Sequence, residues 1–354
     1  MTTIHVQTSR PYDIVVGREL LDRAGDLARE VNQGTRALIV TDSHVFPLLA
    51  GRVLRSFEAA GYTADVFVFD AGEEHKRLSV IADIYHKLAS MALTRQDLLV
   101  ALGGGVTGDM TGFAAATWLR GTDFVQIPTT LLAQVDASIG GKTGVDIEEG
   151  KNLVGSFWQP VRVIADIQSL ATLPPETFAD GMAEVIKTAC IKDAELFAQL
   201  EAGTAMDGAH MENTIARCME IKKGIVERDE TESGERKLLN FGHTMGHALE
   251  KYYDYTSLTH GRAVALGMVI ISEAAERQKL TEEGTTARIM RALQCYDLPI
   301  ADTATLDDYL PGVANDKKRA GDTIDLALLH TIGDSFIYRL PLSLLGAFLR
   351  GEDA

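Results

Sequence analysis

Cysteine is scarce in this 354-residue chain, and its placement excludes two common uses of the residue. Cys190, Cys218 and Cys295 lie far apart in the sequence, without the spacing typical of a zinc finger. Their odd number also excludes a framework in which every cysteine forms an intramolecular disulfide. We therefore expect a protein of a reducing compartment, the cytoplasm, and not a secreted disulfide scaffold.

The sequence also lacks long apolar runs and an excess of basic residues. No window reaches the roughly 18 consecutive apolar residues of a membrane span, and residues 1–5 have no feature of a signal peptide. With 34 basic and 50 acidic side chains, the net charge is -16. This charge argues against nucleic acids and anionic membranes as partners, so an anionic small-molecule substrate would need a local basic pocket.

Short apolar, β-branched runs alternate with helical patterns in the first half of the chain. The strand-like runs lie at 37–40, 64–69 and 98–102, and the helical patterns between them lie at 47–60 and 81–91. This alternation predicts β-α-β units on a largely parallel, Rossmann-like sheet, and so an α/β domain.

Long helical patterns dominate the second half, at 176–200, 210–228 and 261–277, and predict a mainly α-helical domain. The segment Thr172-Leu173-Pro174-Pro175 separates the halves. Its prolines cannot donate backbone hydrogen bonds and bias the preceding residues toward extended geometry. We therefore expect two domains, at 1–172 and 173–354.

The segment Gly103-Gly104-Gly105-Val106-Thr107-Gly108 has the G-x-G-x-x-G spacing, after a predicted strand and before a helical pattern. Glycines there let backbone amides approach a pyrophosphate at a helix N-terminus. The spacing alone is equally compatible with a glycine turn that binds nothing. The acid suited to a ribose, Asp42, ends an earlier strand, so different turns would hold the adenosine and the pyrophosphate.

Two further segments carry polar groups that suit a ligand. Gly72-Glu73-Glu74-His75-Lys76 follows a predicted strand and offers a carboxylate for ribose hydroxyls, although its composition is more typical of a solvated charged turn. The segment 128–152 gathers hydroxyls, glycines, an amide and two lysines, which together suit a phosphate or carboxylate. A flexible surface loop is the alternative there, but apolar residues on both sides predict that the segment is pinned.

His243 and His247 lie on a helical pattern that places their imidazoles one turn apart on the same face. The glutamate of the H-E-x-x-H peptidase motif is absent, because Thr244 occupies its position. His260 and Glu184 are further candidates, and two imidazoles with a carboxylate suit zinc with one position open to substrate. The spacing leaves open which three of the four bind, and a structural histidine pair hydrogen-bonded to carbonyls is the alternative.

At these motifs the sequence resembles the 3-dehydroquinate synthases, and the likeness extends over nearly the whole chain. It is densest at 103–160 and 181–268, and it includes Glu184-Val185-Ile186-Lys187, the run Asn240-Phe241-Gly242-His243-Thr244-Met245-Gly246-His247, and His260-Gly261. Several long motifs in the family's order are more specific than any one of them. The resemblance implies an N-terminal NAD-binding α/β domain, a C-terminal helical metal-binding domain and a homodimer.

The resemblance also implies roles for individual residues. The zinc ligands, with cobalt able to replace zinc, would be Glu184, His243 and His260, and His247 would be a catalytic hydrogen-bonding and proton-relay group. Arg120 would reach the phosphate pocket of a neighbouring subunit. The substrate contacts would be Asp136, Lys142, Asn152, Lys187, Lys222, Arg236 and Asn240, with a lysine of the 316–318 stretch. NAD would be held by Asp42, Glu73, Lys76, Gly103, Gly104, Gly105, Asp109, Thr129, Thr130, Lys142, Lys151 and Thr172.

The implied activity converts 3-deoxy-D-arabino-heptulosonate 7-phosphate to 3-dehydroquinate and phosphate, in the shikimate pathway of aromatic amino acid biosynthesis. NAD would oxidise a ring hydroxyl transiently, so that the neighbouring C–H becomes acidic and phosphate is eliminated. Return of the hydride, ring opening and an intramolecular aldol closure would follow. Zinc would polarise the carbonyl as a Lewis acid, and the enzyme would be a phosphate-eliminating carbon–oxygen lyase.

Three alternatives are open at this point. Another sugar-phosphate cyclase, making a valiolone or a deoxyinosose, is the nearest, but Lys222, Asn240 and His247 favour dehydroquinate. A metal-dependent polyol dehydrogenase would turn NAD over and need no lysine cluster. A non-catalytic NAD-sensing or scaffold protein is disfavoured by the assembly of histidines, glutamate and lysines. The chain departs from the family pattern at Arg262, where glutamate is usual, and at Asp146, where asparagine is common.

Overall fold

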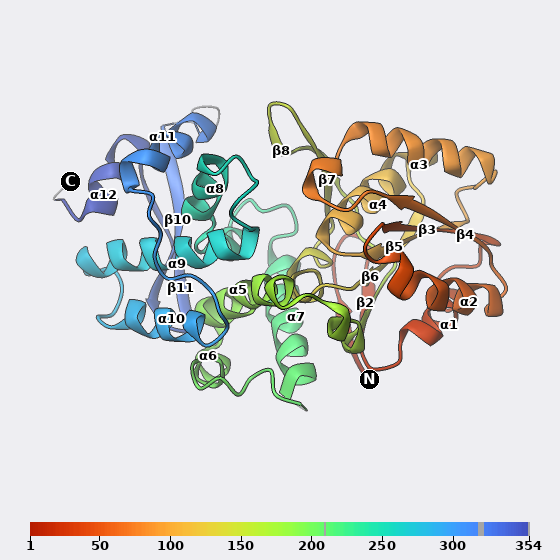
Figure 1. Ribbon diagram of the computed structural model, residues 1–354, viewed down its shortest axis with the longest axis horizontal. Coiled ribbons are helices and arrows are strands. Elements are labelled where there is room, and N and C mark those ends of the chain that lie inside the picture. The colour runs from red at the N-terminus through yellow and green to blue at the C-terminus, as the bar shows by residue number, and fades with distance from the viewer. Residues whose placement is uncertain (209, 318–321, 353–354) are drawn as a thin grey trace. The chain divides into compact units, whose positions relative to one another are not determined.

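The computed structural model describes residues 1–208, 210–317 and 322–352. The chain forms two compact units, Met1–Pro174 and Pro175–Ala354 (Figure 1). Their boundary falls between two prolines, and Pro175 is the first residue of helix α5 (Pro175–Lys192). Proline is well tolerated there, because the first helical N–H has no partner within the helix.

A seven-stranded sheet forms the centre of the first unit, in the order β1-β2-β9-β6-β5-β3-β4. Strand β1 is antiparallel to β2, and every other neighbouring pair is parallel. The strands are β1 (Thr2–Val6), β2 (Tyr12–Gly17), β3 (Arg36–Asp42), β4 (Thr63–Phe69), β5 (Leu98–Gly103), β6 (Asp123–Pro128) and β9 (Arg162–Asp166). The largely parallel sheet confirms the predicted Rossmann-like fold, although β1, β2, β6 and β9 were not among the predicted strands.

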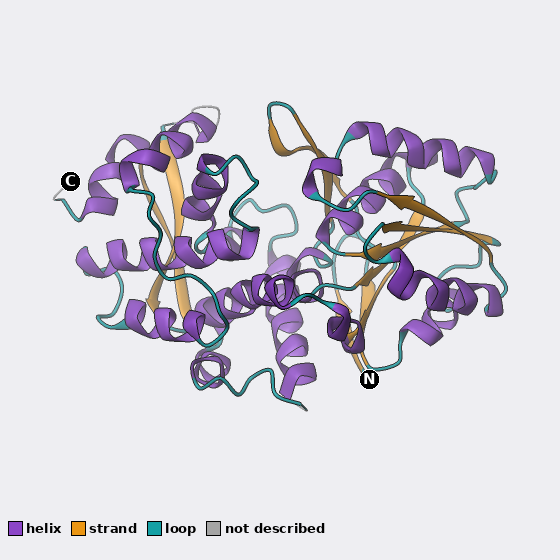
Figure 2. Ribbon diagram, viewed as in Figure 1, coloured by secondary structure: helices purple, strands orange, loops and turns teal. Residues whose placement is uncertain are grey.

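Helices cover both faces of this sheet (Figure 2). Along β3, Ala37 and Ile39 pack with residues of one face, while Leu38 and Val40 pack with residues of the other. A parallel strand buried on both sides needs this unbroken apolar run, because neither face meets water. The helices are α1 (Ala24–Arg29) and α2 (Gly51–Ala59) on one face, and α3 (Leu78–Ser90) and α4 (Gly105–Thr117) on the other.

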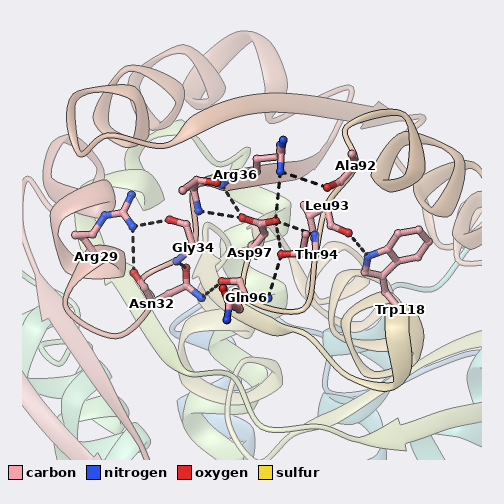
Figure 3. Close-up of polar contacts among 11 residues, drawn as sticks. Arg29, Asn32, Gly34, Arg36, Ala92, Leu93, Thr94, Gln96, Asp97 and Trp118 are labelled. Atoms are coloured by element: carbon pink, nitrogen blue, oxygen red, sulfur yellow. Dashed lines mark hydrogen bonds and ion pairs between the residues drawn. The ribbon is translucent and has the colours of Figure 1, made fainter.

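Asp97 ties the amino ends of β3 and β5 together (Figure 3). Its buried carboxylate accepts hydrogen bonds from the backbone N–H groups of Thr35, Arg36 and Thr94 and from the Thr94 hydroxyl, at 2.7–2.9 Å. Burial alone would raise the pKa of Asp97, but these donors lower it below its ordinary value. The network connects β3 and β5 at their amino ends. Open α/β sheets bind ligands at the opposite end, where the strands have their carboxyl ends.

The second part of the segment 128–152, which the sequence predicts as pinned, forms most of a β-hairpin, β7 (Lys142–Ile147) and β8 (Gly150–Phe157). Strand β7 packs against α4, and Val145 is fully buried in the core that α3 and α4 share. Strand β7 is therefore pinned, as predicted, whereas Leu153 on β8 is 55% exposed. The glycines and charges of the hairpin hid the strand pattern, because the alternation of buried and exposed residues is short.

The second unit is mainly helical, as predicted, with α9 (His260–Arg277) packed against α5, α8, α10 and α12. The remaining helices are α6 (Ala194–Glu201), α7 (His210–Arg228), α8 (His243–Tyr252), α10 (Thr285–Gln294), α11 (Leu306–Lys317) and α12 (Leu345–Arg350). The helix predicted at 176–200 is divided at Asp193, whose carboxylate caps α6 by accepting from the Leu196 N–H at 2.9 Å.

The same unit contains an antiparallel hairpin, β10 (Thr323–Thr331) and β11 (Asp334–Pro341), that the sequence analysis did not predict. Its apolar residues Leu326, Leu328 and Leu329 are buried. A short apolar run of this kind is ambiguous between strand and helix when only its pattern is considered. Among the described residues, no helix is long and apolar enough to cross a membrane.

Candidate cofactor and metal sites

The carboxyl edge of the parallel sheet has a topological switch point between β3 and β5. From β3 the chain continues to β4, the outermost strand of the sheet, and then returns to β5 on the other side of β3. Helices α2 and α3, which make these two connections, lie on opposite faces. Such a reversal opens a crevice at the strand ends, where open α/β sheets bind their ligands.

Glycines and an acid flank this switch point. Asp42 ends β3, and Gly103, Gly104 and Gly105 lead from β5 into α4. A Cβ atom on Gly103 would lie 2.4 Å from Oγ1 of Thr107, so only glycine fits there. The first-turn N–H groups of α4, with the positive end of the helix dipole, form a site for an anion such as a pyrophosphate.

Asp42 is already hydrogen-bonded in the protein. Its Oδ1 accepts from the backbone N–H groups of His44 and Val45 at 2.9 and 3.0 Å, and its Oδ2 accepts from the Thr107 hydroxyl at 3.3 Å. The carboxylate therefore links the end of β3 to the first turn of α4. This fixes the acid beside the glycine loop, although the two come from different turns.

The turn after β4 contributes a charge cluster around one buried lysine. Lys76 is only 4% exposed, and its Nζ lies 2.7 Å from Asp109, 2.6 Å from Asn152 and 4.0 Å from Glu73. Lys151 lies 3.8 Å from Glu73. Burial alone would lower the pKa of Lys76, but Asp109 and Glu73 raise it above its ordinary value. Interpretation of this segment as a solvated charged turn is therefore wrong for Lys76.

Other predicted residues follow neighbouring strands at the same edge. Thr129 and Thr130 come directly after β6, and the Thr129 N–H donates to the carbonyl of Gly103 at 2.9 Å. Asp136 lies in the short helix η5 (Ala133–Ala137), and the exposed Thr172 ends η6 (Ile167–Thr172) after β9. Lys142 does not follow a strand of this sheet, because it begins β7 of the separate hairpin, and it is exposed as well.

Arg120 lies elsewhere in the unit. Helix α4 begins at the carboxyl edge and β6 starts from the amino edge, so the connection between them, which contains Arg120, lies at the amino edge. Leu119 and Arg120 both have positive φ, at 51° and 68°, and Gly121 follows at 123°. The structure therefore does not bring Arg120 to the carboxyl edge, where Asp42, the glycine loop and Thr129 lie.

Three side chains of the second unit form a cluster with the character of a metal site. The ligand atoms of Glu184, His243 and His260 all lie within 4.8 Å of one another. The Nε2 atoms of His243 and His260 lie 3.5 and 3.4 Å from Oε1 of Glu184. A tetrahedral zinc ion with bonds of about 2.0–2.1 Å would hold its ligand atoms about 3.3–3.4 Å apart, so these separations fit one ion.

Glycine-mediated contacts bring the three ligands together. Helices α8 and α9 cross closely, because a Cβ on Gly267 would lie 2.0 Å from the carbonyl oxygen of Gly242. A Cβ on Gly261 would lie 2.3 Å from the carbonyl oxygen of Asp180, so the start of α9 lies directly on α5. His243 follows Gly242 and His260 precedes Gly261, and each imidazole is therefore placed by a backbone contact.

The second nitrogen of each histidine is also held. His243 Nδ1 lies 3.2 Å from the carbonyl oxygen of Phe241, and His260 Nδ1 lies 3.4 Å from Oε2 of Glu250. These acceptors require the proton on Nδ1, which leaves Nε2 of each ring for a metal. Glu250, 4% exposed, was missed by the sequence analysis, although it lies seven residues after His243 and three after His247 on the same helix.

The carboxyl groups also control the charge of the site. Neither oxygen of Glu184 accepts a hydrogen bond of normal geometry from the residues that the structure describes, and Lys187 Nζ forms an ion pair with Oε2 at 2.5 Å. Burial would lower the pKa of His260, but Glu184 and Glu250 raise it to about 10. A divalent cation that binds there must displace this proton.

His247 is exposed, and its ring centre lies 5.4 Å from that of His243 and 6.0 Å from that of His260. Among the described residues, the ligand-atom cluster around Glu184 includes His243 and His260 but not His247. His247 instead groups with Glu250 and His260. The structure therefore distinguishes His247 from His260 as neighbours of Glu184 and His243, which the spacing in the sequence could not do.

Three cationic side chains are buried in the same unit. Lys187, Lys222 and Arg236 are 1%, 6% and 1% exposed. They lie on α5, α7 and the short helix η7 (Glu235–Asn240), which pack on one another. A buried cation needs a compensating partner. Lys187 pairs with Glu184, and Arg236 donates to the Glu230 carbonyl. Together with Lys222 they concentrate positive charge that suits an anionic ligand.

A tight loop positions Arg236 and Asn240. Asp229 accepts from the backbone N–H groups of Ser233, Gly234 and Arg236 at 2.7–2.9 Å. Burial opposes ionisation, but these donors lower the pKa of Asp229 to about 2. The Asn240 side-chain amide donates to Glu232 at 3.0 Å, a partner that the sequence analysis did not identify. The predicted lysine of the 316–318 stretch lies outside the residues whose side chains are described.

Comparison with known proteins gives a consistent result. Two family models match the chain, 3-dehydroquinate synthase N-terminal over residues 66–180 and 3-dehydroquinate synthase C-terminal over residues 181–319. A 3-dehydroquinate synthase of Clostridium beijerinckii is 44% identical over 333 residues, which cover 93% of this chain and 95% of that protein.

Two solved structures share the fold. A 2-epi-5-epi-valiolone synthase from Streptomyces hygroscopicus, solved with NAD+ and Zn2+, has a TM-score of 0.87 and 28% identity, with 98% of each chain covered. A 2-deoxy-scyllo-inosose synthase, complexed with carbaglucose-6-phosphate, NAD+ and Co2+, has a TM-score of 0.87 and 24% identity, with 99% of this chain and 100% of that chain covered.

Proposed function

The chain belongs to the 3-dehydroquinate synthase family, and from this premise we propose that it converts 3-deoxy-D-arabino-heptulosonate 7-phosphate to 3-dehydroquinate and inorganic phosphate. The resemblance that the sequence motifs indicated is thereby confirmed. In this reaction the protein acts as a phosphate-eliminating carbon–oxygen lyase. The observation that carries the proposal is the set of three buried cations in the unit with the metal-ligand cluster.

Lys187, Lys222 and Arg236 distinguish this activity from the oxidation of a polyol. A neutral polyol needs a metal and NAD but carries no charged group for these three cations to contact. The proposed substrate carries a phosphate and a carboxylate, and the net charge of the chain is -16. Buried cations would attract these groups despite the negative net charge of the chain. They would also hold the phosphate in a fixed geometry, and such positioning can lower the activation free energy by several kcal/mol.

Glu184, His243 and His260 would hold zinc, or cobalt in its place. The separation of their ligand atoms supports this assignment, and so does the lack, among the residues that the structure describes, of hydrogen bonds of normal geometry to Glu184. When bound, the metal supplies a Lewis acid for substrate oxygens, and NAD supplies a reversible acceptor of hydride. His247 would donate and accept the proton of a substrate hydroxyl, because its imidazole is exposed one turn from His243.

The first unit would bind NAD at the carboxyl edge of its sheet. The switch point between β3 and β5, the glycine loop and Asp42 support this role. We accordingly propose residues 1–172 as the NAD-binding domain and residues 173–354 as the metal- and substrate-binding domain. We also propose a cytoplasmic homodimer. Arg120 lies at the amino edge, away from the edge where its own unit would bind ligands, which leaves it available to a neighbouring subunit. The described cysteines are free thiols, which suits a reducing cytoplasm.

One assay tests the activity. Phosphate release from 3-deoxy-D-arabino-heptulosonate 7-phosphate is measured with zinc and with NAD at concentrations far below that of the substrate. We expect complete conversion without accumulation of reduced nicotinamide, because the hydride returns to the substrate in the same site. Stoichiometric reduced cofactor would instead indicate a polyol dehydrogenase, and no conversion would refute the proposal.

A further inference from the structure

Two backbone irregularities and a buried lysine meet at the β7–β8 hairpin. Asn152 has φ of 55°, a left-handed conformation that is uncommon for a residue other than glycine. The hairpin register shifts between Val145 and Ile147, which places an irregularity at Asp146. Lys76, from a different turn, is buried against this point. Bulges and left-handed residues persist where the surrounding structure fixes them, and they concentrate near functional sites.

A closed ring of hydrogen bonds explains how these features persist together. The Asp146 N–H donates to the Lys76 carbonyl at 2.7 Å, and the Asn152 N–H donates to Oδ1 of Asp146 at 2.7 Å. Lys76 Nζ then donates to Oδ1 of Asn152 at 2.6 Å. Lys76 also donates to Asp109 at 2.7 Å, which anchors the ring to α4. Asn152 is thus held through both its backbone and its side chain.

The ring determines which end of the Asn152 carboxamide is exposed. A lysine ammonium group has three donors and no acceptor, so the carboxamide atom facing Nζ must be the oxygen. The NH2 group of Asn152, on an exposed residue, then points away from Lys76. Asn152 therefore offers donors to a ligand and keeps its acceptor occupied.

We propose that Lys76 and Asp146 are positioning residues that orient Asn152, so that its NH2 group donates to an anionic oxygen of the substrate. This inference rests on the proposed function, which supplies an anionic substrate and makes Asn152 one of its contacts. It also accounts for the departure at Asp146. Aspartate and asparagine both present an oxygen that accepts from the Asn152 N–H, so either residue closes the ring.

Two substitutions of Asn152 test the orientation. Asn152→Ala removes the donor, and Asn152→Asp keeps the size and the Lys76 contact but replaces the donor with an acceptor. Binding of a non-reacting carbocyclic phosphonate analogue to the zinc- and NAD-loaded protein is measured by calorimetry. We expect the dissociation constant to rise roughly 10- to 100-fold for Asn152→Ala and more for Asn152→Asp. Tighter binding by Asn152→Asp than by Asn152→Ala would overturn the proposal, because the oxygen would then face the ligand.

Substitutions of Asp146 test the positioning. Asp146→Asn should bind the analogue like wild type, whereas Asp146→Ala should weaken it by roughly 3- to 30-fold with an unchanged dissociation constant for NAD. Glu148→Gln, a charge change at an exposed residue of the same hairpin, is the matched control and should alter neither constant. An Asp146→Ala protein that loses NAD affinity as much as analogue affinity would overturn the positioning role, because the hairpin as a whole would have been disturbed.

The phosphate-release assay of the wild type distinguishes a failure of the positioning inference from a failure of the proposed function. A wild type that releases phosphate, combined with the wrong order of the Asn152 variants, overturns the positioning inference and leaves the proposed function intact. A wild type that neither releases phosphate nor binds the analogue overturns both. Thermal unfolding of each variant, expected to remain cooperative, verifies that the comparison concerns folded proteins.

Discussion

Substitution of Gly267 by alanine should disrupt the metal site from a distance. Gly267 lies on α9, two turns after His260, where α9 crosses α8. The added Cβ would lie 2.0 Å from the carbonyl oxygen of Gly242, 2.8 Å from the N of Gly246 and 2.9 Å from the carbonyl carbon of Gly242. All three neighbours are backbone atoms, so no side chain can rotate to make room.

The required displacement is large compared with the tolerance of a metal site. Carbon and oxygen atoms repel strongly below about 3 Å, so the two helices must separate by about 1 Å at this point. His243 immediately follows Gly242, and its distance to Glu184 would change with the helix. Zinc bonds tolerate deviations of only about 0.2 Å, so we expect at least a tenfold loss of zinc affinity. Overpacking of the crossing should also destabilise the fold by about 1–3 kcal/mol.

Chelator competition for zinc and denaturant unfolding measure these two effects. Gly224→Ala is the matched control, because its Cβ would meet only the flexible side chain of Arg228, at 3.4 Å, within helix α7. Alanine there should raise stability by about 0.5–1 kcal/mol and leave zinc affinity unchanged. Wild-type zinc affinity and stability in Gly267→Ala would show that the close crossing of α8 and α9 does not determine the site.

Three further predictions concern individual side chains. Glu250→Gln should weaken zinc binding by about 10- to 100-fold in chelator competition while the protein stays folded, because His260 loses a charged hydrogen-bond partner; unchanged affinity would contradict this role. Since the carboxylates raise the pKa of His260 to about 10, protons compete with the metal, and zinc affinity measured between about pH 6 and 8 should rise by up to about tenfold per pH unit. A flat profile would mean that His260 is not a ligand. Arg236→Ala and Lys142→Ala should each raise the dissociation constant of the phosphonate analogue by roughly 10- to 200-fold with full zinc content, and wild-type affinity in both would place the phosphate elsewhere.

Features with a strong local pattern could be predicted from the sequence. The apolar runs of β3 and β5 and the glycines before α4 are readable because burial on both faces and the helix start impose residue types on consecutive positions. The hairpin β10–β11 was missed because a short apolar run does not distinguish strand from helix. The burial of Lys76 was also missed, because its partners Asp109 and Asn152 lie 33 and 76 residues away in the sequence.

Residue types alone reveal the chemistry available to this protein: imidazoles and a carboxylate for a metal, glycines for a close backbone approach, and cations for an anion. Residue spacing leaves open which of these groups act together. Glu184, His243 and His260 come from three different helices, and the choice between His247 and His260 depends on how these helices cross. That crossing is decided only in the tertiary structure, where backbone contacts at Gly261 and Gly267 bring α5, α8 and α9 close enough for three ligand atoms to meet.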